Sequence, residues 1–169
     1  MPELLKKSSP GLFIAVFLAC LFKLCSFDLF WHLGCGQYFF ENLSIIDHNI
    51  FSWTYPDYPW IPTYWLFQAI LYGIWKISGF TGLIILNALI LASTWMILAS
   101  TLENKGLLNL LTFILLMALA DLSLFRFMLR PHIFTFLGLS LLIRWASEPE
   151  FFLPSRIGLL KIFLLFLLN

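Results

Sequence analysis

The chain has 169 residues, of which 61% are hydrophobic and only 11% are charged, and its formal net charge is +1. An average soluble domain is about 25% charged, so ten basic and nine acidic side chains cannot cover the surface of a soluble fold of this size. The near-zero net charge provides no basic patch for a nucleic acid, and three scattered cysteines fit neither a disulfide framework nor a zinc site. The composition therefore predicts a polytopic membrane protein with no nucleic-acid partner.

The chain begins with a short polar lead and a first apolar segment at 11–27, which predicts an uncleaved transmembrane helix. A secretory signal peptide has a similar pattern, but no small-x-small cleavage site follows this segment. Lys6 and Lys7 precede it and place the N-terminus in the cytoplasm by the positive-inside rule. We therefore expect an integral membrane protein with a cytoplasmic N-terminus.

The stretch 28–65 is the part of the chain richest in chemically informative side chains. It contains four of the nine acidic residues, two of the three histidines and four of the seven tryptophans, and no Lys or Arg occurs between Asp28 and Lys76. In the topology set by the N-terminus, residues 28–62 form a large first extracytoplasmic loop. We expect this loop to carry short interfacial helices.

Further apolar segments follow the loop and predict an all-α protein with about six transmembrane helices. Helices are expected because the segments lack the strict alternation of barrel strands. They lie at 64–77, 81–101, 107–124 and 133–145, with an incomplete sixth segment from 157. That last segment stops short of the roughly 20 apolar residues that a span needs. We therefore expect residues 1–169 to form a single transmembrane module, the N-terminal part of a longer protein.

Asp28 and His32 are the candidate catalytic pair. Asp28 directly follows the first apolar segment, and the two residues share one helix face if that helix continues briefly, because they are four positions apart. A carboxylate beside an imidazole at a membrane surface is suited to accept a proton. The alternative is that Asp28 only caps or ends the helix, with His32 in an interfacial hydrogen bond, since ionisable residues at helix ends are common.

Four residues later in the stretch 28–65 are the candidate substrate contacts. Asp47 and His48 could form a second acidic element facing the same cavity as Asp28, or only a turn, which Asp and Asn favour. Trp60 and Trp65 could stack on a sugar, or belong with the other aromatic side chains to an interfacial belt. The sequence contains no pattern for a metal or a cofactor, and none is expected.

Four short elements follow one another between residues 28 and 132. They comprise Asp28, Phe30, Trp31, His32, Leu33 and Gly36; Asn49, Phe51, Ser52 and Thr54; Pro59, Trp60, Tyr64, Trp65 and Leu66; and Arg130, Pro131 and His132. In order and spacing they resemble the D-x-W-W-H-L-x-x-G, D-x-F-S-x-T, P-W with E-W-L, and R-P-Q elements of the GT-C superfamily of membrane glycosyltransferases. Within this superfamily, the chain resembles the bacterial group that is similar to dolichyl-phosphate-mannose mannosyltransferases.

The resemblance implies transfer of a sugar from a polyprenyl-phosphate-linked donor to an extracytoplasmic acceptor at a bacterial inner (plasma) membrane. It implies that Asp28 is the general base for the acceptor hydroxyl, with membrane lipid and the donor as partners. Asn49 and Tyr64 stand where Asp and Glu are common in the family, and His132 replaces Gln, so two carboxylates are absent.

Two other classes of protein are alternatives to the enzyme. The alternative is an inactive truncated fragment or a non-catalytic membrane subunit, completed by a missing C-terminal region or by a partner subunit. A transporter fragment is disfavoured, because few ionisable residues lie in the central parts of the spans and ion pathways normally use them.

Overall fold

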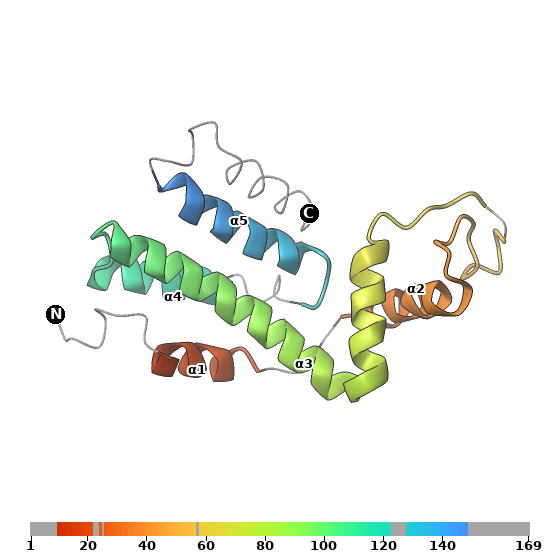
Figure 1. The fold of residues 1–169 in the computed structure, drawn as a ribbon, viewed down its shortest axis with the longest axis horizontal. Coiled ribbons are helices and arrows are strands. Elements are labelled where there is room, and N and C mark those ends of the chain that lie inside the picture. Colours follow the sequence, from red (N-terminus) through yellow and green to blue (C-terminus); the bar gives the residue numbers. More distant parts are fainter. Residues whose placement is uncertain (1–9, 22–23, 25, 57, 123–127, 149–169) are drawn as a thin grey trace. The chain divides into compact units, whose positions relative to one another are not determined.

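The computed structural model describes residues 10–21, 24, 26–56, 58–122 and 128–148, and within these ranges the chain is helical without any β-strand (Figure 1). The helices are α1 (Pro10–Ala19), α2 (Leu29–Asn42), α3 (Trp65–Asn104), α4 (Leu110–Leu122) and α5 (His132–Ala146). The predicted all-α class is therefore confirmed for the described residues. The incomplete sixth segment, from 157, lies outside them.

Among the described helices, α3 alone is long and apolar enough to cross a membrane, as judged by length and composition. α4 and α5 are apolar but have 13 and 15 residues, and α1 has 10. A helix that crosses the hydrocarbon core needs about 20 residues. The expectation of about six transmembrane helices is therefore not confirmed, although α4 lies within the segment predicted as the fourth span and α5 covers the segment predicted as the fifth.

α3 has a break at Gly79, where φ is 62° and ψ is −155°. This backbone conformation is essentially restricted to glycine, because a β-carbon would clash with neighbouring backbone atoms. α3 therefore consists of two helical segments, which correspond to the predicted spans at 64–77 and 81–101. The described residues fall into two compact units: a loop unit within Cys25–Ile84, and a bundle unit within Met1–Leu24 and Ile85–Asn169.

In the loop unit, α2 packs against the first segment of α3 (Figure 1). The buried residues of α2 are Leu29, His32, Leu33, Cys35 and Gly36. Gly36 brings the two backbones close together, as small residues do where helices cross. α2 ends at Leu43, whose φ is 51° and whose backbone N–H donates to the Phe39 carbonyl oxygen at 2.8 Å. This left-handed end turns the chain into the loop that precedes α3.

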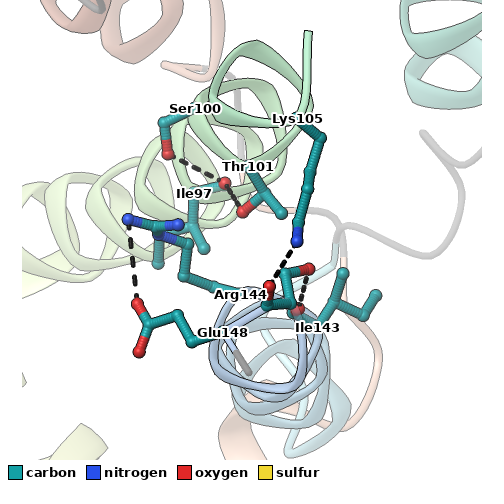
Figure 2. Close-up of polar contacts among 8 residues, drawn as sticks. Ile97, Ser100, Thr101, Lys105, Ile143, Arg144 and Glu148 are labelled. Carbon is teal, nitrogen blue, oxygen red and sulfur yellow. Dashed lines mark hydrogen bonds and ion pairs between the residues drawn. The ribbon is translucent and has the colours of Figure 1, made fainter. Parts of the chain in front are cut away.

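In the bundle unit, the C-terminal ends of α3 and α5 lie side by side (Figure 2). Nζ of Lys105, just after α3, donates to the carbonyl oxygen of Ser147, just after α5. Arg144 in the last turn of α5 forms an ion pair with Glu148 at 3.9 Å. Both cations lie at helix C-termini, where positive charge is favourable. α4 follows α3 and carries the chain back toward the start of α5, so the C-terminal ends of α3 and α5 are expected to lie near each other.

Candidate functional site

The start of α2 places Asp28, Trp31 and His32 within about one helical turn. Asp28 is the N-cap residue, with φ −84° and ψ −7°, and its carbonyl oxygen accepts a hydrogen bond from the His32 backbone N–H at 2.9 Å. Asp28 and His32 therefore have the expected i, i+4 relationship, but at the start of a new helix and not in a continuation of α1. Residues three and four apart are neighbours along a helix, so the exposed Asp28 lies one turn before the half-buried Trp31 and the buried His32.

His32 is buried, with 4% of its surface exposed. Its Nδ1 lies 3.3 Å from Nε2 of Gln68 in α3, and the ring of Phe67 meets the imidazole edge to face with centroids 5.2 Å apart. An amide NH2 group only donates, so with this assigned amide orientation a neutral His32 accepts at Nδ1 and carries its proton on Nε2. His32 thus ties the first turn of α2 to α3, and Asp28 is the member of the pair that is open to solvent.

The second part of the site is a short antiparallel pairing in the loop between α2 and α3. The backbone N–H of Asn49 donates to the Tyr58 carbonyl oxygen at 2.8 Å, and that of Trp60 donates to the Asp47 carbonyl oxygen at 3.0 Å. These bonds lie on either side of an isolated β-bridge between positions 48 and 59. The pairing fixes the register in which the side chains of Asn49, Tyr58 and Trp60 are presented.

Trp31, Asn49, Tyr58 and Trp60 line an open cavity of about 290 Å³ in the loop unit. The indole rings of Trp31 and Trp60 have centroids 5.1 Å apart and planes inclined at 52°. Tyr58 is 61% exposed, whereas the other three residues are half-buried. An aromatic lining with a few uncharged polar groups is typical of a site for a small organic molecule.

Asp47 and His48 lie beside this cavity, in the paired segment of the loop. His48 Nδ1 is 2.5 Å from Oδ1 of Asp47, and the two side chains are 41% and 80% exposed, respectively. The hydrogen bond from His48 lowers the pKa of the Asp47 carboxyl below its ordinary value. Asp47 is therefore ionised at neutral pH and paired with His48, while its backbone holds Trp60 in place.

The predicted substrate contacts do not all meet at one place. Trp60 lines the cavity. Trp65 instead begins α3, and its indole packs on Phe39 in the second half of α2 with centroids 5.6 Å apart. Asp28 and His32 both lie at the start of α2, with Asp28 exposed and His32 buried, and the catalytic or substrate roles of all six predicted residues stay predictions.

Four residues that shape the site were not assigned to it from the sequence. Trp31, Asn49 and Tyr58 line the cavity, and Gln68 holds His32. Trp31 and Asn49 do belong to the motif-like elements between residues 28 and 54, and this membership could have identified them as site residues. Gln68 is a polar residue inside a predicted span, and such residues commonly pair within the protein.

Comparison with known proteins finds no relative: no family model, curated protein or solved structure matches the chain. Within the described part of the chain, no group of three or more His, Cys, Asp and Glu residues is placed to hold a metal ion. The functional assignment therefore depends on the geometry of the loop unit and on the motif resemblance.

Proposed function

We propose that the protein is a membrane glycosyltransferase that transfers a sugar from a polyprenyl-phosphate-linked donor to an extracytoplasmic acceptor. The observation that carries this proposal is that α2 bears both the exposed Asp28 and Trp31, which forms a wall of the open aromatic cavity. A carboxylate one helical turn from a stacking surface is suited to accept a proton from a hydroxyl of a bound sugar. The hydroxyl oxygen then bonds to the anomeric carbon of the donor, and the bond from that carbon to the lipid phosphate breaks.

Burial in lipid is supported by the apolar surfaces of the bundle unit. α4 exposes large apolar side chains along its length: Leu110, Leu111, Ile114, Leu115, Met117, Leu119 and Leu122. Exposed apolar surface on this scale marks contact with a membrane or another protein. A polyprenyl-linked donor requires a membrane-embedded enzyme, so we place the module in a bacterial inner (plasma) membrane. Its N-terminus would be cytoplasmic, and α1, α3, α4 and α5 would contribute to the spans.

The test replaces Asp28 by Asn and measures sugar transfer in membranes that contain the protein. Radiolabelled polyprenyl-phosphate hexoses serve as a panel of donors, and the amount of product is measured as the radiolabel that leaves the lipid fraction. General base catalysis contributes roughly 10²–10⁴-fold, so Asp28→Asn is expected to lower the rate at least 100-fold. Glu41→Gln is the matched control, because Glu41 is an exposed carboxylate on the same helix that accepts from Gln37 at 2.8 Å.

Two results would count against this assignment. Transfer by Asp28→Asn at the wild-type rate and equal expression would remove Asp28 as the base. Failure of the wild-type protein to transfer any sugar of the panel would favour the non-catalytic alternative.

A non-catalytic membrane subunit is the second candidate, and Asn49 favours it. Asn49 lines the cavity at a position where the resembling family commonly has a carboxylate. An amide binds hydroxyl groups but cannot act as a base. A protein with this cavity and no useful base would bind a saccharide without transferring it. Introducing Asn49→Asp and finding transfer where the wild type shows none would support this candidate.

A further inference from the structure

We propose that the cavity lined by Trp31, Asn49, Tyr58 and Trp60 binds a single uncharged sugar ring, and that the donor phosphate is held by other parts of the protein. The choice of a saccharide rests on the proposed function. The new parts of the proposal are that the ligand is uncharged and that it is a single ring. Together they define the class of ligand that the loop unit binds.

The shape of the cavity favours one ring. Its volume of about 290 Å³ is at the small end of ligand sites, which are roughly 300–1,000 Å³. The inclined indoles of Trp31 and Trp60, with centroids 5.1 Å apart, present two adjoining aromatic surfaces. Aromatic surfaces can bury the apolar C–H face of a sugar ring. The cavity is therefore suited to a monosaccharide unit.

Among the described residues of the lining, the polar groups are uncharged. The Asn49 side chain can donate and accept hydrogen bonds, and the Tyr58 hydroxyl can do both as well. Oδ1 of Asn49 already accepts a weak hydrogen bond from the Phe51 backbone N–H at 3.3 Å, which holds the amide in position. Sugar hydroxyls also donate and accept, so they match these two groups.

The surrounding charge disfavours an anion. Residues 24–75 contain no Lys or Arg, and the described carboxylates in this range are Asp28, Glu41 and Asp47. A phosphate in this cavity would find no Lys or Arg within residues 24–75 and would meet the negative potential of the described carboxylates. Phosphate groups in proteins are normally held by Arg, Lys or helix N-termini. The basic residues that contact the donor phosphate must therefore come from outside 24–75.

A cationic ligand is the competing occupant, because aromatic cavities also bind ammonium groups through cation–π contacts. The surrounding carboxylates would attract a cation, but the described lining itself offers an amide at position 49 and no carboxylate to contact an ammonium group. The nearby carboxylate of Asp47 already pairs with His48 at 2.5 Å. An uncharged ring is consequently the better match.

The test measures ligand binding to the full chain in lipid nanodiscs by saturation-transfer NMR. The probes are the methyl glycosides of glucose, mannose and galactose, compared with methyl glucuronoside and the methyl glycoside of glucosamine. Inorganic phosphate has no carbon-bound protons, so it is tested as a competitor of the neutral glycosides. We expect saturable binding of at least one neutral glycoside, with each charged probe at least fivefold weaker.

Variants then locate the site. Trp60→Ala and Asn49→Ala are expected to weaken binding of the neutral glycoside at least tenfold, whereas Trp60→Phe keeps an aromatic face and weakens it less. Trp53→Ala is the matched control, since Trp53 is 91% exposed in the same loop and is not part of the described lining. Its affinity should stay within twofold of the wild type.

Failure of every neutral glycoside to bind, or equal binding of phosphate or of the amino glycoside, would overturn the inference. If Asp28-dependent transfer is nevertheless observed, the proposed function stands and only the cavity assignment fails. Binding that depends on Trp60 without any transfer has the opposite meaning, because it supports the cavity assignment and contradicts the proposed enzyme.

Discussion

Gly36 of α2 lies so close to Gln68 of α3 that a β-carbon on residue 36 would be 2.2 Å from the Gln68 carbonyl oxygen. The other nearest atoms, Cβ of Tyr72 at 2.6 Å and the carbonyl carbon of Gln68 at 2.9 Å, are also near the backbone and cannot swing aside. Trp31 and His32 lie earlier on the same helix. The position of the cavity wall therefore depends on the absence of a side chain at residue 36.

Gly36→Ala is expected to destabilise the loop unit by about 2–3 kcal/mol, the upper part of the range for overpacking in a well-packed contact. Thermal unfolding of the protein in nanodiscs should show a lower midpoint. Gly73→Ala on α3 is the control, because a β-carbon there would lie 3.5 Å from the Phe40 ring, an ordinary contact. Alanine in a helix interior is favoured over glycine by roughly 0.5–1 kcal/mol. Equal midpoints for the two variants would contradict the close approach.

Gln68→Leu removes the donor that faces Nδ1 of His32 across 3.3 Å. A buried hydrogen bond contributes about 1 kcal/mol net, so a loss of that size in the free energy of unfolding is expected. Nitrogen chemical shifts of labelled histidine should also show that the proton no longer favours Nε2. Gln37→Leu is the control, since Gln37 is an exposed glutamine on α2. A tautomer equilibrium unchanged by Gln68→Leu would show that Gln68 does not set it.

The helices of the bundle unit were the most predictable part of the fold. A continuous apolar run can bury its backbone polar groups in lipid only as a helix or a closed barrel, and the run at 133–145 indeed forms α5 (His132–Ala146). α2 was expected only as an unspecified interfacial helix. Its residues Gly34, Gly36 and Gln37 interrupt the apolar pattern, and its burial depends on a contact with α3 that no local pattern encodes.

The cavity was less predictable than the helices for a similar reason. Trp60 was identified as a candidate sugar contact, but Asn49 and Tyr58 meet it only because positions 47–49 pair with 58–60. Such a pairing is set by tertiary contacts and by turn geometry and not by residue composition. Trp65 was grouped with Trp60 because both are tryptophans of the stretch 28–65, whereas Trp65 begins α3 and packs on Phe39.

Gly79→Ala is expected to destabilise the protein by roughly 1–3 kcal/mol, the cost of holding a side chain in a backbone region that is essentially restricted to glycine. Gly79 has a φ of 62°, and a β-carbon there would have no atom within 4 Å, so strain and not crowding is the cause. The unfolding midpoint measured against Gly73→Ala separates this strain from the general effect of alanine in a helix. A midpoint as high as that of Gly73→Ala would mean that position 79 does not adopt this conformation.

Cys35 provides a pH-dependent test of the contact between α2 and α3. The thiol is 3% exposed, and burial raises its pKa from an ordinary value of 9.0 to about 11. A group whose pKa is higher in the folded state stabilises that state below its unfolded pKa, and this contribution is lost as the pH rises through the folded pKa. The wild type should therefore lose stability relative to Cys35→Ala between about pH 9 and pH 11, as measured by the difference in unfolding midpoints. Other groups titrate in this range in both proteins, so their effects cancel in the difference. A difference that stays constant from pH 8 to pH 11 would show that Cys35 is accessible to water in the folded protein, and would count against the packing of α2 on α3.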